Sequence, residues 1–305
     1  GVIRNLTSNS KKIDNHNKFF WATIGGMGLT GVIIEATISL IKIESAFMNV
    51  DTYKCADLDS LMEIMKSKDK FYSYSVAWVD SLNKSFRGVI TCAEHASKDD
   101  LNINDLDLLS YNSKNLGSAP KFLPNGILNK FTVSTFNKFW FIKSTIFKKN
   151  IQTIPQFFYP LDGISNWNRI YGINGFYQYQ FVVPENKSYF ISKTLSTLKR
   201  FSSNSFLTVL KRFGNSNNSF LSFPQPGWTL SVDLPASNKE LLNVLNQLDE
   251  ELASLGGKIY LAKDSRQSSE IFKKTYSFYL DWKKIKCEMD PDNIFQSDLS
   301  RRLKL

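Results

Sequence analysis

The sequence is poor in the side chains that most often carry chemistry. Its 305 residues include three cysteines and two histidines, and no apolar run approaches the roughly 18 residues that a membrane-spanning helix needs. Cys55, Cys92 and Cys287 are too far apart for a zinc motif or a disulfide framework, which favours a reducing compartment. His16 and His95 lie in polar stretches typical of solvated loops. We therefore expect no metal site and no transmembrane segment.

Acidic residues are missing from one long segment. No Asp or Glu occurs between Asp107 and Asp162, although seven lysines fall there among many phenylalanines, and the net charge of the whole chain is +10. This mixture suits an anionic lipid surface, because amines meet phosphate while aromatic rings enter the interface. The same mixture of lysines and aromatic rings is compatible with binding of single-stranded nucleic acid. It is also compatible with an ordinary solvated surface over buried rings. Turn signals predict a loop-rich region. The lysines are Lys114, Lys121, Lys130, Lys138, Lys143, Lys148 and Lys149.

The remaining composition is that of a folded protein. Hydrophobic residues make up 42% of the chain and aromatic residues 14%, which excludes an intrinsically disordered class. A length of 305 residues is enough for two hydrophobic cores. The chain begins at Gly1 rather than Met, and residues 2–6 resemble a strand already under way. We therefore expect a fragment that lacks its N-terminal part.

A glycine-rich turn, Gly26-x-Gly28-x-x-Gly31, is the most informative motif. It matches the turn of nicotinamide-dinucleotide sites, which needs a strand before it and a helix after it. Here residues 18–23 predict a short aromatic helix, and the β-branched residues 32–40 predict a strand. This reversed order disfavours nicotinamide binding and favours a turn that lies along a flavin nucleotide. A plain tight turn that needs glycine dihedrals is the open alternative.

Strands and helices alternate along the rest of the chain. Strands are predicted at residues 72–79, 175–184, 206–213 and 228–234, and helices at residues 188–201 and 239–255. Gln178 and Gln180 share one face of their strand, since side chains repeat every two residues. The expected fold class is α+β, with helices on one side of an antiparallel sheet.

Longer segments carry a family resemblance. Residues 77–81, 122–131, 156–184, 222–235, 260–266 and 290–303, together with the glycine turn, resemble in order the decaprenylphosphoryl-β-D-ribose 2′-oxidases. These are FAD-dependent oxidoreductases of the vanillyl-alcohol-oxidase, or PCMH, type. The resemblance implies the C-terminal portion of a PCMH-type FAD-binding domain plus a substrate domain. Residues 1–44 would end the FAD-binding domain, residues 45–257 would form the substrate-binding domain, and residues 258–305 would return to the FAD-binding domain.

The resemblance also implies roles for individual residues. Tyr260 and Lys263 would be catalytic and lie beside the flavin, where a cation stabilises the charge that develops on the ring. Cofactor-binding residues would be Gly25, Gly26, Gly28, Gly31, Tyr260 and Lys263. Substrate-binding residues would be Trp78, Gln178, Gln180, Lys211 and Ser231.

Two positions depart from the family pattern. Phe158 stands where the family usually has tyrosine, and Ser231 stands where its mycobacterial members carry a cysteine that covalent nitroaromatic inhibitors trap. Serine is a much weaker nucleophile than a thiolate, so we expect resistance to this trapping.

The implied activity is oxidation of the 2′-hydroxyl of a polyprenyl-phosphoryl pentose to the 2′-keto sugar, with FAD as cofactor. This reaction is the first half of an epimerisation that supplies arabinan precursors of cell-wall arabinogalactan, and a short-chain dehydrogenase would be the partner reductase. The protein would associate peripherally with a membrane, in the bacterial cytoplasm or at the periplasmic face, without a nucleic-acid partner. The fragment alone would be inactive. A sugar-lactone or polyol oxidase of the same flavin family, and a non-catalytic lipid- or nucleic-acid-binding module, are the alternatives.

Overall fold

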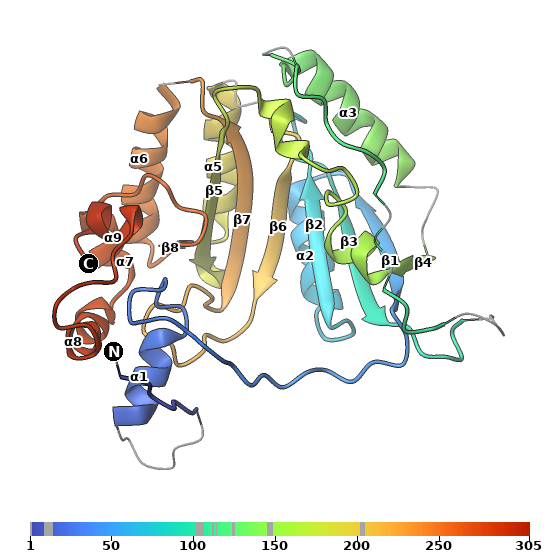
Figure 1. Ribbon diagram of the computed structural model, residues 1–305. Helices are drawn as coiled ribbons and strands as arrows, with labels where there is room; N and C mark the ends of the chain where they lie inside the picture. The colour runs from blue at the N-terminus through green and yellow to red at the C-terminus, as the bar shows by residue number, and fades with distance from the viewer. Residues whose placement is uncertain are drawn as a thin grey trace.

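An antiparallel sheet of eight strands forms the centre of the protein (Figure 1). The computed structural model describes residues 2–8, 15–101, 107–111, 113, 115–123, 126–144, 149–201, 205–238 and 240–305. The strand order is β4-β1-β3-β2-β6-β7-β5-β8, and every neighbouring pair is antiparallel. The strands are β1 (Phe47–Cys55), β2 (Tyr74–Val79), β3 (Gly88–His95), β4 (Lys149–Thr153), β5 (Phe176–Pro184), β6 (Thr208–Phe213), β7 (Gly227–Pro235) and β8 (Lys258–Ile259).

Helices flank this sheet, which confirms the expected α+β class. In Figure 1, α2 and α5 lie behind the strands, α3 lies at the upper edge, and α7, α8 and α9 gather near α1. In the described part of the chain, no helix is long and apolar enough to cross a bilayer. The helices are α1 (Asn15–Thr23), α2 (Leu58–Lys68), α3 (Lys130–Lys143), α4 (Ile154–Phe158), α5 (Tyr189–Arg200), α6 (Glu240–Ser254), α7 (Ser269–Thr275), α8 (Tyr279–Met289) and α9 (Asp298–Leu303), with 3-10 turns η1 (Trp167–Tyr171) and η2 (Glu185–Lys187).

The main core lies between one face of the sheet and helices α2, α5 and α6. Alternate strand residues such as Ala77, Leu210 and Leu230 are fully buried there. The helices contribute residues at helical spacing, including Leu61 and Met65 of α2. Helix α2 begins where the Asp57 side chain accepts a hydrogen bond from the Ser60 amide at 2.8 Å. The opposite sheet face is consequently free of these helices.

A second core joins the two ends of the chain. It contains Phe19 and Leu29 near the N-terminus, and Phe272 and Trp282 near the C-terminus. The Trp282 indole donates a hydrogen bond to the carbonyl of Ala22 at 3.0 Å, which fixes α8 against α1. The division at residues 44 and 257 stays a prediction.

Two predicted features near the N-terminus are wrong. Residues 32–40 do not form a strand, and neither do residues 2–6. The first segment is an extended connection that crosses below the sheet in Figure 1, and its apolar side chains Val32, Ile33, Ile34, Ile38 and Leu40 are between 63% and 84% exposed. A strand requires a neighbour to accept its backbone hydrogen bonds, which β-branched composition alone does not supply.

Gly227 is the position where the fold depends most clearly on a missing side chain. Its φ is +149°, and a Cβ atom there would lie 1.9 Å from the carbonyl oxygen of Val183 in the neighbouring strand β5. We expect Gly227→Ala to lower the free energy of unfolding by about 3 kcal/mol or more, because backbone atoms of two central strands must separate. Urea denaturation measures this. Gly214→Ala is the control, since its Cβ would meet nothing within 4 Å; equal stability of the two variants would contradict the prediction.

Candidate functional site on the open face of the sheet

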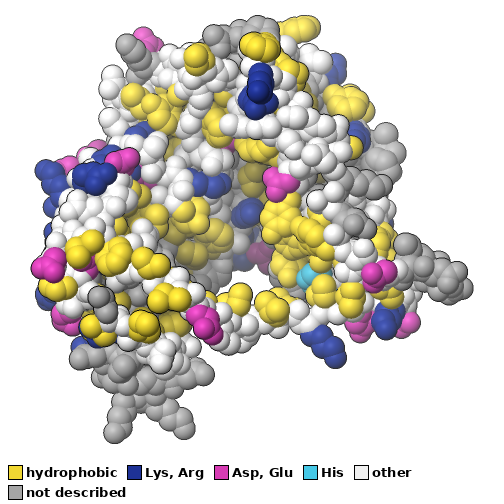
Figure 2. Space-filling view, viewed as in Figure 1, with side chains coloured by type: hydrophobic (Ala, Val, Ile, Leu, Met, Phe, Trp, Pro, Cys, Tyr) yellow, Lys and Arg dark blue, Asp and Glu magenta, His cyan; other side chains and the backbone are white. Residues whose placement is uncertain are grey.

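The residues predicted to bind substrate share the sheet face that the main helices leave open. Residues paired across an antiparallel sheet point to the same side, and the register defines a row Trp78–Val209–Ser231–Gln180 across β2, β6, β7 and β5. Gln178 and Lys211 lie two positions from Gln180 and Val209, so they belong to the same face. Figure 2 shows this side of the molecule as a hollow with Lys and Arg side chains inside it.

Hydrogen bonds hold the side chains of this face in place. The Trp78 indole donates to the carbonyl of Phe206 at 2.9 Å. Gln180 donates through Nε2 to Thr229 Oγ1 at 3.1 Å, and Gln178 donates through Nε2 to Asp233 Oδ1 at 3.0 Å. The hydrogen bond to Phe206 therefore fixes the indole of Trp78. The other two bonds direct the Nε2 group of each glutamine toward its acceptor.

The segment after β8 brings the two residues predicted to be catalytic to the same face. The Tyr260 amide donates to the carbonyl of Gln180 at 2.9 Å, which extends the pairing of β8 with β5. Its ring stacks on Phe223 with centroids 4.6 Å apart. The chain then turns, and Lys263 Nζ donates to Ser231 Oγ at 3.4 Å. Lys263 and Ser231 thus meet although 32 positions separate them.

Charged groups influence one another within this hollow. Burial lowers the pKa of Lys263; nearby Lys211 lowers it further, whereas Asp233 opposes the shift. Burial also lowers the pKa of Lys211. Burial raises the pKa of Asp233 to about 6, although hydrogen bonds from Gln178 and Tyr171 and the charge of Lys263 favour its ionised form. Lys263 therefore lies close enough to Lys211 and to Asp233 for their charges to affect its protonation.

Asp233 was missed by the sequence analysis. It lies between Val232 and Leu234 in β7, its side chain is buried, and it accepts a hydrogen bond from the Tyr171 hydroxyl at 3.1 Å. A signal for it was present, because Asp233 shares the two-residue period of Ser231 and thus the polar face of the strand. Its partner Tyr171, in η1, was not predictable, since it comes from a separate segment.

Two of the glycines in the glycine turn border open space. Gly25, Gly28 and Gly31 have φ values of +71°, +73° and +147°. A Cβ on Gly28 or Gly31 would meet no atom within 4 Å, so open space borders the backbone there, whereas a Cβ on Gly26 would lie 2.2 Å from the carbonyl of Ala22. The turn therefore fits the close approach of a dinucleotide at Gly28 and Gly31, and Gly26 serves the tight packing after α1.

Aromatic side chains cover the other half of the open face. Phe158 of α4 packs edge-to-face on Tyr74 with centroids 4.9 Å apart, and Tyr74 also contacts His95 at 5.5 Å. His95 Nε2 lies 3.2 Å from the Tyr74 hydroxyl. His95 is thus part of a packed aromatic wall, and its prediction as a solvated loop residue is wrong. His16 has no described side chain.

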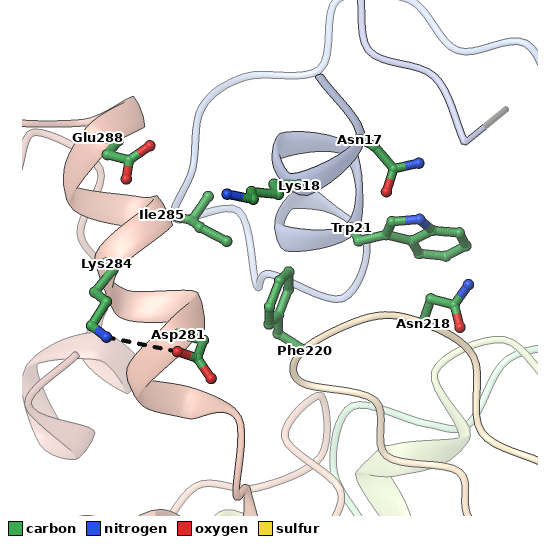
Figure 3. A pocket seen from close by; sticks show the side chains of 9 residues that line it. All are labelled: Asn17, Lys18, Trp21, Asn218, Phe220, Asp281, Lys284, Ile285 and Glu288. Atoms are coloured by element: carbon green, nitrogen blue, oxygen red, sulfur yellow. Dashed lines mark ion pairs between the residues drawn. The ribbon is translucent and has the colours of Figure 1, made fainter. Parts of the chain in front are cut away.

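A cavity lies elsewhere among the described residues. It has a volume of about 510 Å³ and opens between α1, α8 and the segment at residues 218–220 (Figure 3). Asp281 and Lys284 on its rim are 3.8 Å apart and largely exposed. None of the residues predicted from the sequence lines it. We place the candidate site on the sheet face, because buried ionisable groups and defined hydrogen-bond donors converge there.

Comparisons with known proteins indicate the class of protein to which the chain is related. No protein-family model matches the chain. The fold is similar to that of Physcomitrella patens BBE-like 1, which superposes with a TM-score of 0.52 over 95% of this chain and 61% of that one, at 12% identity. The chain is homologous to FAD-dependent oxidoreductases.

One homologue is decaprenylphosphoryl-β-D-ribose oxidase of Mycolicibacterium smegmatis, which is 37% identical over 310 residues. The alignment covers all of this chain and 66% of that relative. An uncharacterised Streptomyces coelicolor protein, from the mprA 5′ region, is 28% identical over 96% of this chain and 82% of its own length.

The raised pKa of Asp233 has a consequence for stability. A carboxyl that binds its proton more tightly in the folded state stabilises the fold below its unfolded pKa of 3.8, and this contribution is lost as pH rises through about 6. Asp233→Asn has no carboxyl to ionise at this position, so its stability does not contain this loss as the pH rises. We expect the stability of the variant relative to the wild type to increase by about 2 kcal/mol between pH 4 and pH 7. Urea unfolding across that range tests it, and a difference that does not vary with pH would contradict it.

Proposed function

We propose that the protein oxidises the 2′-hydroxyl of a polyprenyl-phosphoryl pentose to the 2′-keto sugar, with FAD as hydride acceptor. The observation that carries this proposal lies on the sheet face that presents two glutamine amides: Lys263 donates a hydrogen bond to Ser231 there and interacts electrostatically with Asp233. The 37% identity to an oxidase of decaprenylphosphoryl-β-D-ribose supports the substrate class. The chain spans 66% of that relative, so the proposal concerns the complete protein.

The residues of this chain fit one side of a flavin site. Gly28 and Gly31 leave open space beside positive-φ backbone, and Tyr260 and Lys263 lie where β8 leads into the hollow. Bound FAD would supply the acceptor for a hydride from the sugar carbon. Lys263 would then provide positive charge beside the reacting centre, in a hollow where burial strengthens its electrostatic effect.

The substrate would be held by donors on the sheet face. Lys211 and Lys263 are cations suited to phosphate oxygens or sugar hydroxyls, and Gln180 adds an amide to the same face. Trp78, fixed by its bond to Phe206, offers a flat apolar surface for the sugar ring. We further propose a partner reductase of the short-chain dehydrogenase type, because a 2′-keto sugar must be reduced to complete an epimerisation.

The test uses the protein expressed from its complete reading frame. We expect flavin bands in the visible spectrum that bleach on anaerobic addition of polyprenyl-phosphoryl ribose. Lys263→Met should slow the bleaching by about 100-fold or more, because the positive charge at the site is lost. Stopped-flow absorbance measures the rate, and Lys84→Met, in an exposed turn, is the control.

Other outcomes would overturn this assignment. Flavin bands that persist with the lipid-linked sugar but bleach with a soluble aldonolactone would indicate a sugar-lactone oxidase. A colourless protein would contradict the cofactor and favour a non-catalytic binding module.

We also propose that α3 contacts the membrane that carries the lipid substrate. Val133 and Asn137 of α3 are buried, whereas Phe131 and Phe139 are 79% and 62% exposed. The helix lies at the upper edge of the molecule in Figure 1. Large exposed rings interleaved with basic side chains and no acidic ones match an anionic interface. The lysines of α3 are Lys130, Lys138 and Lys143; Lys114 and Lys148 lie outside the described residues.

Vesicle sedimentation tests this contact. We expect the complete protein to sediment with vesicles that contain phosphatidylglycerol and less with pure phosphatidylcholine. Phe131→Ser combined with Phe139→Ser should lower the bound fraction at least several-fold, because two rings no longer enter the interface. Phe278→Ser is the matched control, since Phe278 is 61% exposed but precedes α8 rather than belonging to α3. Equal binding of all three proteins would contradict the role of α3.

A further inference from the structure

Asp233 is an unusual residue for the middle of a sheet. Its side chain is 1% exposed, and among the described residues it forms no salt bridge. Its oxygens accept from two neutral donors, Tyr171 at 3.1 Å and Gln178 at 3.0 Å. Burying a carboxylate without a direct cationic partner is costly. A neutral side chain would pack at this position without the cost of burying a charge. We therefore look for a functional reason for Asp233.

We propose that Asp233 is a positioning residue of the sheet-face site, which fixes the orientation of the Gln178 amide and supports the positive charge of Lys263. This inference rests on the proposed function only for the identity of the substrate. Asp233 itself need not touch the substrate, because both of its oxygens are engaged by Tyr171 and Gln178. It acts through the groups that face the ligand.

The chemistry of the carboxylate decides which way the amide points. An ionised carboxylate only accepts hydrogen bonds, so Gln178 must turn Nε2 toward Asp233 and keep Oε1 on the other side as an acceptor. A sugar hydroxyl can donate to that oxygen. A protonated carboxyl can donate instead, which permits the opposite amide orientation. The orientation of Gln178 therefore depends on the protonation of Asp233.

Four groups face this carboxylate or share its charge balance. Tyr171 approaches from η1 and Gln178 from β5, both by hydrogen bonds. Lys263, from the turn after β8, interacts with it electrostatically. Lys211 of β6 repels Lys263 rather than acting on Asp233 directly. Asp233 thus opposes the effect of Lys211 on the charge of Lys263, and its removal leaves Lys263 with a like-charged neighbour.

Nuclear magnetic resonance gives a test that does not depend on turnover. The complete protein, with FAD, is labelled with ¹⁵N-glutamine, and Gln178→Met identifies the resonances of Gln178. We expect the side-chain NH₂ signals of Gln178 to shift in a single titration near pH 6 in the wild type and to stay constant in Asp233→Asn. Gln180, which donates to Thr229 instead, is the internal control. A Gln178 signal that does not titrate in the wild type would overturn the proposal.

Kinetics extends the test to the proposed reaction. We expect the rate of flavin reduction in the wild type to fall about tenfold per pH unit below pH 6, as Asp233 becomes protonated. Asp233→Asn should react about tenfold or more slowly at pH 7.5 and lose this acid limb, while Tyr171→Phe should keep the limb because the contact with Gln178 remains. An unchanged acid limb in Asp233→Asn contradicts the role of Asp233.

The two failures are distinguishable. A wild-type flavin that the lipid-linked ribose does not reduce would contradict the proposed function, while the titration of Gln178 would still decide the role of Asp233.

Discussion

The alternation of side chains in the antiparallel register of β2, β6, β7 and β5 is the constraint on which the site depends. Because the period is two residues, Ala77, Leu210 and Leu230 enter the main core only if their neighbours face the other way. The same register that builds the core therefore assembles Trp78 and Ser231 with the glutamines on the open face. A slip of one residue in any of these strands would bury the polar groups and expose the core.

A buried polar network positions the turn that carries Lys263. Arg266 forms two hydrogen bonds with Asp249 of α6, at 2.7 and 2.9 Å, and the Tyr179 hydroxyl joins the same carboxylate at 3.0 Å. Asp264 accepts from the amides of Arg266 and Gln267 at 3.0 and 2.9 Å. Such networks specify geometry more than they add stability. Here the geometry matters because Lys263 lies between these anchors and β8.

The open face has two halves of different character. On the side of β5 and β7 the floor is polar and carries the ionisable groups, whereas α4 covers the side of β1 and β3 with Phe157 and Phe158. A ligand with a polar head and an apolar tail finds both chemistries in one hollow. The polyprenyl-phosphoryl sugar of the proposed function has this form.

Local patterns in the sequence determined most of the regular secondary structure. Strands with clear alternation, such as β5 and β7, and helices with clear periodicity, such as α5 and α6, form within two residues of their predicted bounds, because burial of one face enforces the period. Only the tertiary structure decided the rest. Residues 32–40 have strand-forming side chains but no neighbour to pair with, and α3 forms where turn signals predicted loops because the Asn129 cap begins a helix. Asp233 acquires its partner Tyr171 from 62 positions away, and Ser231 meets Lys263 across 32, because strand register and chain return bring distant residues together. The sequence by itself determines which chemical groups the side chains carry. The burial of these groups and their proximity to one another, on which the function depends, arise only when the sheet is assembled.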